Sequence, residues 1–308
     1  MKRFTTILYW FLCLDIIFML LGPLFWLFDL WVHFAVQFGI VALICVALLI
    51  RQKRYRLTLP LILAVIYFSW PFIISWKVGM APSRGSMPEG ILISIFQVNA
   101  SYFNDDHERL IQAILKEDST VIAISEATTV WRTALRESLS AEYPYIAEAP
   151  LEGYEGMMNL SKIPFDHSQH VRFDDETPPL LETTISEYNL TLMNIHTLSP
   201  VSGSWSKKRD AYLSFIADHV RKTEGTVIVA GDFNTTVHSR PFKKMLRSAD
   251  LTSSRRGWKP TWMVGTPLAA AIDHILYRGD NIQAVDFKVL PSIGSDHRPI
   301  MSTFIVSQ

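Results

Sequence analysis

The sequence predicts an α/β or α+β domain of roughly 220 residues, preceded by an N-terminal bundle of about three transmembrane helices. Two observations support this division. Residues 7–76 consist mostly of Leu, Ile, Phe, Val and Trp. Beyond residue 90, short runs rich in Ile, Val and Thr alternate with a few amphipathic stretches, which is typical of the strands and helices of a globular domain.

The charges divide along the same boundary. The chain has 308 residues and no net charge. Residues 1–85 hold two acids, Asp15 and Asp29, and eight bases, which leaves 27 of the 29 acids and 21 of the 29 bases for residues 86–308. That region therefore has a formal charge of −6, which counts against tight nonspecific binding to duplex DNA.

The apolar region, residues 1–77, is long enough for several membrane crossings, because one crossing takes about 20 residues. We expect helices over residues 7–28, 32–50 and 57–76. The first two are separated near Asp29 and His33, which interrupt the apolar run. A cleaved signal peptide fits poorly, since the run is too long and further spans follow it.

The basic loop at residues 51–56 (RQKRYR) predicts the orientation. The positive-inside rule places this loop in the cytoplasm together with Lys2 and Arg3, so the third helix runs outward. We expect an integral protein of a bacterial inner or cell membrane, with its C-terminal domain in the periplasm or outside the cell. Cys13 and Cys45 both lie in predicted spans, so the outer domain has no disulfide.

A linker rich in Gly, Pro and Ser is expected over residues 78–90, and a folded domain over residues 91–308. The expected strands are, in order, Ile91 to Val98, Thr120 to Ser125, Leu180 to Ser186, Leu190 to Ile195, Thr226 to Ala230, Ile272 to Tyr277 and Pro299 to Val306. Two helices are expected, Glu108 to Lys116 and Lys207 to Lys222, because their apolar residues recur at three- and four-residue spacing.

Polar residues able to bind a metal or move protons stand repeatedly at the ends of these strands. They are Asn99, Glu126, His196, Asp232, Asn234, Asp273, Asp296 and His297. A single Asp or Asn after a strand is usually a turn residue. A series of them indicates a site, because catalytic groups are often carried on loops that a rigid scaffold fixes.

Three motifs carry a resemblance to a known family. They are Gly231 to Asn234 (GDFN), Ile272 to Leu276 (IDHIL) and Gly294 to Pro299 (GSDHRP). With the lesser matches around them, residues 91–306 resemble the endonuclease/exonuclease/phosphatase superfamily, which includes exonuclease III, deoxyribonuclease I and the neutral sphingomyelinases. The resemblance implies a membrane-anchored, bacterial-type member with a four-layer sandwich, two packed mixed β-sheets flanked by helices, and an active site at one end.

The resemblance also implies phosphodiester hydrolysis that depends on Mg²⁺, with Mn²⁺ or Ca²⁺ as alternatives. Hard cations prefer carboxylate and amide oxygens. Glu126 is therefore the first expected ligand, with Asn99 beside it and Asp296 as a further contributor. His297 is the expected general base, and Asp273 is expected to hold its ring in the right tautomer.

Three more residues have roles implied by the resemblance. Asp232 is expected to orient or deprotonate the attacking water, a role that it and His297 can share or exchange, and Asn234 is expected to donate hydrogen bonds to the phosphate. His196 matches a His of the deoxyribonuclease I and sphingomyelinase branches, where abasic-site endonucleases carry Tyr. Ser125 departs from the Gln that usually precedes the metal-binding Glu.

Two further residues, His274 and Trp262, either line the substrate site or pack at the edge of the core, and the sequence leaves both interpretations open. Three functions remain. The leading one is a membrane-anchored phosphodiesterase acting on nucleic acid, and the second changes the substrate to a phospholipid or sphingomyelin. The third, a catalytically silent membrane binding protein, is disfavoured because every expected catalytic residue is present. No protein partner is inferred.

Overall fold

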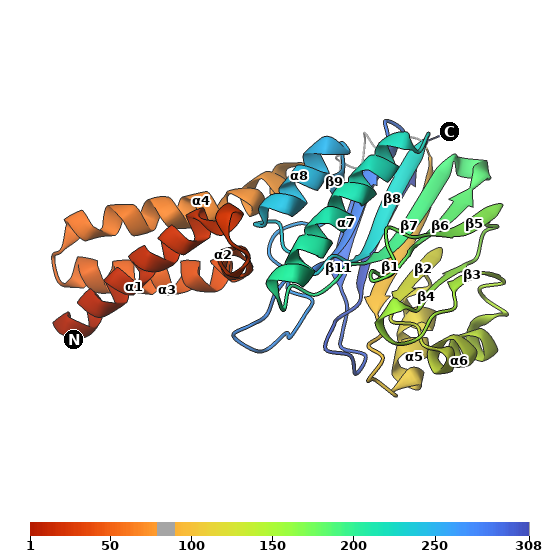
Figure 1. Cartoon of the computed structure of the whole chain (residues 1–308), viewed down its shortest axis with the longest axis horizontal. Coiled ribbons are helices and arrows are strands. Elements are labelled where there is room, and N and C mark those ends of the chain that lie inside the picture. Colours follow the sequence, from red (N-terminus) through yellow and green to blue (C-terminus); the bar gives the residue numbers. More distant parts are fainter. Residues whose placement is uncertain (79–89, 308) are drawn as a thin grey trace.

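The computed structural model describes residues 1–78 and 90–307. It has two parts, an elongated group of N-terminal helices and a domain built on two β-sheets (Figure 1). The linker expected over residues 78–90 lies outside the described residues except at its two ends.

The first sheet is six-stranded and mixed. Its strands are β1 (Ile91–Asn99), β2 (Val121–Ser125), β3 (Tyr145–Ala149), β4 (Met157–Ser161), β11 (Ile282–Val289) and β12 (Ile300–Val306). Their order across the sheet is β11-β12-β1-β2-β4-β3. Strands β1 and β2 run parallel, and the other neighbours run antiparallel.

The second sheet repeats this arrangement. Its strands are β5 (His167–Val171), β6 (Leu180–Ile185), β7 (Leu190–His196), β8 (Thr226–Asp232), β9 (Thr252–Ser253) and β10 (Asp273–Arg278). The order is β5-β6-β7-β8-β10-β9, and β7 and β8 form the parallel pair. The two sheets pack face to face over a core of aliphatic side chains that includes Ile95, Ala123, Ala230 and Ile275.

Helices cover the outer face of each sheet. Helices α5 (His107–Glu117) and α6 (Thr129–Leu139) pack on the first sheet through Leu110, Ile114 and Trp131. Helices α7 (Gly203–Lys222) and α8 (Arg240–Ser248) pack on the second through Tyr212 and Phe242. Short turns η3 (Gly153–Glu155) and η4 (Ser186–Tyr188) complete the domain. The expected layers of helix, sheet, sheet and helix are confirmed.

Each expected strand and helix lies on an observed one. The sequence patterns did not reveal strands β3, β4, β5, β9 and β11 or helices α6 and α8. Strand β5, for example, has the sequence HSQHV and exposes most of its side chains at a sheet edge, so it lacks the apolar alternation that marks a half-buried strand.

The N-terminal region contains four α-helices and two short turns. They are α1 (Lys2–Leu20), η1 (Gly22–Leu24), α2 (Trp26–Val32), α3 (Ala35–Arg51), η2 (Tyr55–Leu57) and α4 (Thr58–Val78). The first helix therefore ends earlier than the expected span 7–28. Gly22 and Pro23 follow it, and a Pro interrupts the helical hydrogen bonds.

Only part of the expected membrane region forms helices that are long and apolar enough to cross a membrane. Among the described residues, α1 is long and apolar enough to cross a membrane, and α2 with α3, bent by 66°, make a second candidate if the pair counts as one span. The sequence predicts three spans, whereas the described residues contain one candidate, or two if the bent pair is counted. The three spans therefore stay a prediction.

Helix α2 and the start of α3 contact the sheet domain through buried polar groups. The Asp29 carboxylate is 2.7 Å from the guanidinium of Arg209 on α7, and it also accepts a hydrogen bond from Ser239. Farther along the chain, the Gln37 amide donates to the carbonyl of Ala269 over 2.6 Å. The helices are thus fixed against the domain at α2.

Candidate active site

The register of the strands brings the predicted residues to one edge of the two sheets. Asn99 is paired with Ser125, so Glu126 follows directly beside it. In the second sheet His196 is paired with Asp232, and Asp232 with Asp273. The expectation that these strand ends converge is therefore met by the pairing itself.

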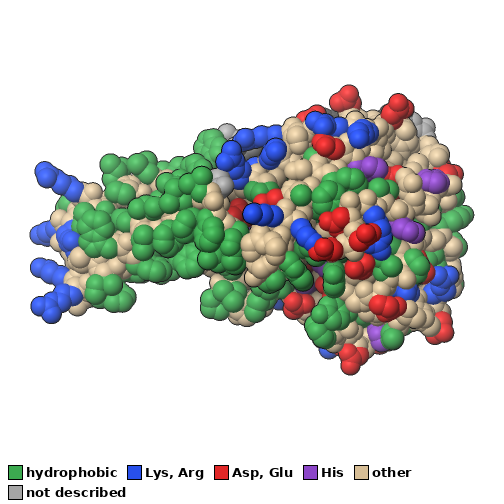
Figure 2. Space-filling model, viewed as in Figure 1, with side chains coloured by type: hydrophobic (Ala, Val, Ile, Leu, Met, Phe, Trp, Pro, Cys, Tyr) green, Lys and Arg blue, Asp and Glu red, His purple; other side chains and the backbone are tan. Residues whose placement is uncertain are grey.

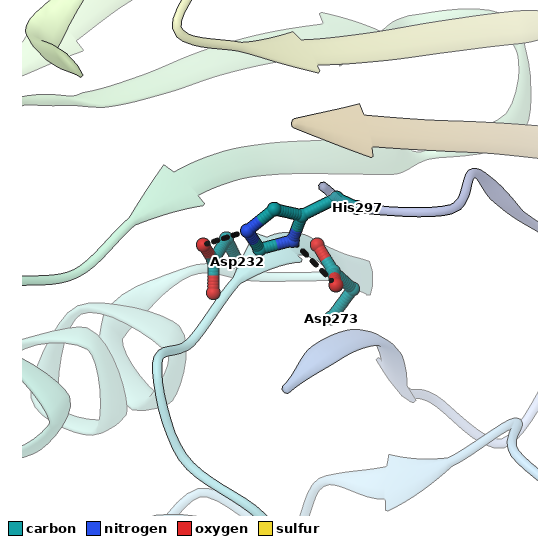
Figure 3. Close-up of side chains that lie close together, drawn as sticks. All are labelled: Asp232, Asp273 and His297. Carbon is teal, nitrogen blue, oxygen red and sulfur yellow. Dashed lines mark hydrogen bonds and ion pairs between the residues drawn. The ribbon is translucent and has the colours of Figure 1, made fainter. Parts of the chain in front are cut away.

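His297 lies between two buried carboxylates (Figure 3). Its Nδ1 is 2.9 Å from Oδ2 of Asp273, and its Nε2 is 3.6 Å from Oδ2 of Asp232. All three side chains are buried. The bond to Asp273 orients the ring, and it leaves Nε2 directed at Asp232.

The three groups shift one another's proton affinity. Burial raises the pKa of Asp232 to about 6, although the charge of His297 opposes the shift. Burial would lower the pKa of His297, yet the charges of Asp273 and Asp232 outweigh it and raise that pKa to about 10. Burial works against ionisation of Asp273, but the charge and hydrogen bond of His297 lower its pKa. In this environment the imidazole holds a proton at neutral pH, and Asp232 is the better proton acceptor.

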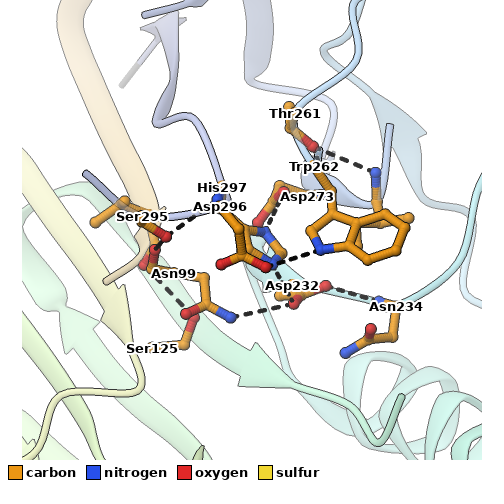
Figure 4. A network of polar contacts seen from close by, with 12 residues as sticks. Asn99, Ser125, Asp232, Asn234, Thr261, Trp262, Asp273, Ser295, Asp296 and His297 are labelled. Atoms are coloured by element: carbon orange, nitrogen blue, oxygen red, sulfur yellow. Dashed lines mark hydrogen bonds and ion pairs between the residues drawn. The ribbon is translucent and has the colours of Figure 1, made fainter. Parts of the chain in front are cut away.

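The backbone around His297 is held by a second set of hydrogen bonds (Figure 4). Ser295 accepts from the His297 amide over 3.0 Å and donates to the carbonyl of Asn99 over 2.9 Å. The guanidinium of Arg255 donates to the carbonyl of Asp273. These contacts join the last motif of the chain to β1 and β10, which explains how a loop can hold the His297 ring in position.

Glu126 and Asn99 form a second polar group at the same edge. The Asn99 amide donates to Glu126 Oε1 over 2.8 Å and to Asp232 Oδ2 over 3.2 Å. The other oxygen of Glu126 accepts from the backbone amide of Tyr102. In this arrangement the amide nitrogen of Asn99 faces the carboxylates, and its oxygen accepts from the amide of Ser101.

The GDFN motif makes a tight turn that presents Asp232. A Cβ at Gly231 would lie 1.9 Å from the carbonyl oxygen of Ile195, so only glycine lets β7 and β8 approach this closely. Asn234 has a φ of 47° and donates its backbone amide to Asp232 Oδ1. Its side-chain amide donates to the carbonyl of Thr197 over 2.8 Å.

His196 is held in one tautomer by a backbone carbonyl. Its Nδ1 is 2.8 Å from the carbonyl oxygen of Tyr154, which can only accept, so Nδ1 carries the proton. The free nitrogen, Nε2, lies 3.7 Å from Glu126 and 3.6 Å from Asp232. His196 therefore joins the two polar groups of the site.

Trp262 and His274, whose roles the sequence did not decide, lie in different environments. The indole of Trp262 donates to Asp296 Oδ2 over 2.9 Å, and both side chains line the site (Figure 4). His274 is fully buried between Phe233 and Phe242 and contacts the carbonyl of Thr235. Trp262 is thus a residue of the site, and His274 is a residue of the core.

A cavity of about 480 Å³ contains most of the predicted residues. Its lining includes Glu126, His196, Asp232, Asn234, Asp296 and His297. Asn99 and Asp273 do not line it and contact these residues from behind. The sequence did not reveal the rest of the wall, which consists mainly of Leu30, His33, Phe34, Leu198, Val201 and Trp205.

The donor atoms suit a hard divalent cation. Carboxylate oxygens of Glu126, Asp232 and Asp296 face one cavity, and such oxygens are the preferred ligands of Mg²⁺. Among the described residues, the acidic and His side chains whose ligand atoms all lie within 4.8 Å are Asp232, Asp273 and His297. Asp273 and His297 already bind each other, and the carboxylates of Glu126 and Asp296 line the same cavity.

Known proteins were compared with the chain as a whole. A model of the endonuclease/exonuclease/phosphatase family matches residues 84–297. Two curated relatives from Vibrio cholerae, each called a UPF0294 protein, are 29% identical over 119 residues. The match spans 37% of this chain and 40% of each relative.

Several solved structures are similar to this one. D. rerio TDP2 complexed with single-strand DNA product has a TM-score of 0.58 at 18% identity, covering 69% of this chain and 98% of that one. An endonuclease/exonuclease/phosphatase from Beutenbergia cavernae gives 0.57 at 18%, covering 70% and 72%. A Staphylococcus aureus beta toxin with bound magnesium ions gives 0.53 at 18%, covering 69% and 99%. At these identities the similarity shows the fold alone.

Proposed function

This chain belongs to the endonuclease/exonuclease/phosphatase family, and we propose that it is a metal-dependent phosphodiesterase held at a membrane by its N-terminal helices. One observation carries the proposal. The imidazole of His297 stands between the buried carboxylates of Asp232 and Asp273, on the wall of a cavity that also contains Glu126. Such a site combines proton transfer with oxygen donors for a cation.

Hydrolysis of a phosphodiester needs a positioned water and stabilisation of the charge that develops on phosphate. Asp232 is the proposed acceptor of the water's proton, because its carboxylate lies on the cavity wall beside His297 Nε2. His297, fixed by Asp273, donates a hydrogen bond to the phosphate from Nε2. Asn234 donates hydrogen bonds to the phosphate, as the resemblance implies, and His196 lies beside the leaving group.

The proposed ligands of the cation are Glu126 and Asp296, with Asn99 positioning Glu126. A divalent cation supplies positive charge that stabilises the phosphate and favours the ionised form of nearby acids. Mg²⁺ is the first candidate, and a relative of similar fold has bound magnesium ions.

The surface of the N-terminal helices supports the membrane anchor. Ile7, Trp10, Leu14 and Ile17 of α1 are all exposed, which is stable in lipid and unfavourable in water. Figure 2 shows apolar side chains along the helices and a group of Lys and Arg at the end far from the catalytic domain. Helix α4, with 21 residues, is about 32 Å long, close to the hydrocarbon thickness of a bilayer at about 30 Å.

This arrangement supports the expected topology. The basic end faces the cytoplasm by the positive-inside rule, so the catalytic domain lies in the periplasm or outside the cell of a bacterium. Nucleic acid is the substrate class expected from the sequence, and D. rerio TDP2, of similar fold, has been seen with single-strand DNA product.

Hydrolysis of bis(p-nitrophenyl) phosphate by the purified full-length protein tests the chemistry. We expect activity with Mg²⁺ or Mn²⁺, loss of that activity with EDTA, and recovery on adding the metal back. His297→Ala and Asp232→Asn should each lower kcat/KM by about 100-fold or more.

The matched control is His170→Ala, which removes an exposed His from edge strand β5 and should leave the rate unchanged. A wild-type protein that cleaves nothing, or a His297→Ala protein as active as the control, would refute the assignment.

A further inference from the structure

One wall of the active-site cavity comes from the N-terminal helices. Leu30 lies on α2, and His33 and Phe34 form the bend between α2 and α3. All three line the same cavity as His196 and His297. Because Gln37 and Asp29 fix this bend against the catalytic domain, the helices complete the active site as well as extending from it.

The wall and rim of the cavity are apolar. Besides Leu30 and Phe34, the loop after β7 contributes Leu198 and Val201, and the first turn of α7 contributes Trp205. Val201 is 67% exposed and Trp205 is 40% exposed. Exposed apolar side chains next to a polar site mark a binding surface for an apolar group.

His33 belongs to this wall and is held by the domain that carries the catalytic side chains. Its Nδ1 accepts from the backbone amide of Thr236, so the proton of the neutral ring is on Nε2. The ring is only 7% exposed, and Nε2 has no hydrogen-bond partner among the described residues. The contact with Thr236 thus fixes the bend between α2 and α3 against the turn that follows β8.

The charge of the cavity distinguishes between substrates. Its lining contains three acids, Glu126, Asp232 and Asp296, and no Lys or Arg among the described residues. A polynucleotide brings a phosphate with every nucleotide, and proteins bind it along a basic groove. A phospholipid carries a single phosphodiester attached to hydrocarbon chains. Such a molecule fits a cavity in which polar side chains lie beside an apolar rim.

From these observations we propose that the substrate is a membrane lipid with a phosphodiester headgroup, which reaches the catalytic side chains from the bilayer past Leu30 and Phe34. The inference rests on the proposed function. The phosphate lies beside His297 and Asp232. The hydrocarbon lies along Val201 and the α2 wall.

The reaction is a simple hydrolysis. The water oxygen bonds to phosphorus as one of the two ester P–O bonds breaks. The water gives up one proton, and the leaving alkoxide gains one, so the products are an alcohol and a phosphomonoester. No oxidant or reductant takes part.

The test uses the full-length protein reconstituted into the lipid vesicles that serve as one of three substrates. These are vesicles of phosphatidylethanolamine, phosphatidylglycerol and sphingomyelin, a single-stranded oligonucleotide, and bis(p-nitrophenyl) phosphate. We expect phosphomonoester products from the vesicles, measured by mass spectrometry, at least about tenfold faster than cleavage of the oligonucleotide at equal phosphodiester concentration.

The outcomes separate the two proposals. If bis(p-nitrophenyl) phosphate and the oligonucleotide are cleaved and the vesicles are not, the lipid inference is wrong and the proposed phosphodiesterase stands. If none of the three is cleaved, both are wrong.

Paired variants test the rim itself. Val201→Asp should lower the ratio of lipid cleavage to bis(p-nitrophenyl) phosphate cleavage about tenfold, and His33→Ala should lower it in the same direction. Val130→Asp on α6 is the matched control, because Val130 is 63% exposed and does not line the cavity. It should leave both rates unchanged. Parallel loss of both activities in Val201→Asp and His33→Ala would overturn the inference, with thermal melting to confirm that each variant is folded.

Discussion

At the scale of single residues, the site depends on buried groups whose partners come from distant positions. His297 contacts Asp273 through one ring nitrogen and faces Asp232 with the other. Each group is stabilised in its charged form by the next, because an isolated buried charge is unfavourable. A change at one of the three therefore alters the protonation of the others, so single substitutions measure the group as a unit.

Gly231 is the residue at which the backbone tolerates no side chain. In Gly231→Ala the Cβ would lie 1.9 Å from the carbonyl oxygen of Ile195, and β7 and β8 would have to separate. We expect a loss of about 3–5 kcal/mol in the free energy of unfolding. Thermal melting in detergent measures this change.

The control is Gly39→Ala on α3, where an added Cβ meets no atom within 4 Å. Alanine favours the helix over glycine by about 1 kcal/mol, so this variant should melt at the same temperature or higher. Equal melting of Gly231→Ala and the wild type would show that the strands can separate without cost.

The residues of the candidate site were predictable because each one lies at the end of an apolar strand, as Asp232 and Asp273 do. His33 was not predictable. Its partner, Thr236, lies 203 positions away, and within the apolar run a His next to Asp29 indicates only a break between helices. Contacts of this kind depend on the tertiary arrangement, which local patterns do not contain.

At the scale of elements, strong apolar periodicity decided what the sequence revealed. Strands β7 and β8 are buried throughout and were predicted. Helix α8 was not, because its nine residues (RPFKKMLRS) bury only Phe242 and Met245. Short elements with few buried residues are stabilised by their neighbours rather than by their own pattern.

Strand β6 and helix α7 are joined by a charged hydrogen bond. Glu182 accepts from His219 over 2.6 Å, and this bond outweighs burial and lowers the Glu182 pKa below its ordinary value of 4.5. A lowered carboxyl pKa stabilises the fold above about pH 4.5, and this stabilisation is lost as the pH falls through the folded-state pKa. Glu182→Gln should therefore cost about 1–3 kcal/mol at pH 6 and much less at pH 3.5.

Urea unfolding of both proteins at pH 6, 5, 4 and 3.5 measures this difference. Glu187→Gln, at an exposed position in η4, serves as the control and should follow the wild type at each pH. A constant difference between Glu182→Gln and the wild type across the series would contradict the prediction.

At the scale of the whole molecule, the helices and the catalytic domain share a buried ion pair. Arg209 is 1% exposed by its side chain and contacts Asp29 on α2. It also donates to the carbonyl of Asn234, next to the active site. The position of α2 is thus connected to the loop that carries Asp232 and Asn234.

Breaking this pair on one side leaves the other charge buried. Because Arg209 keeps its ion pair with Asp210, Asp29→Ala should destabilise the protein by about 1–3 kcal/mol, measured by the shift in melting temperature. Arg221→Ala on α7 is the control, since its pair with Asp218 is exposed on both sides and contributes about 0–1 kcal/mol. Similar shifts for the two variants would mean that the Asp29 pair acts like a surface pair.

The position of helix α2 limits how proteins with this arrangement of helices and sheets can change during evolution. In the proposed function, its residues continue the membrane anchor on one side and form a wall of the active-site cavity on the other. The anchor is therefore not a module that can be exchanged while the enzyme stays the same. Grafting a foreign anchor onto this domain would open the cavity, and a change of substrate can arise from mutations in a segment that, by sequence, belongs to the membrane.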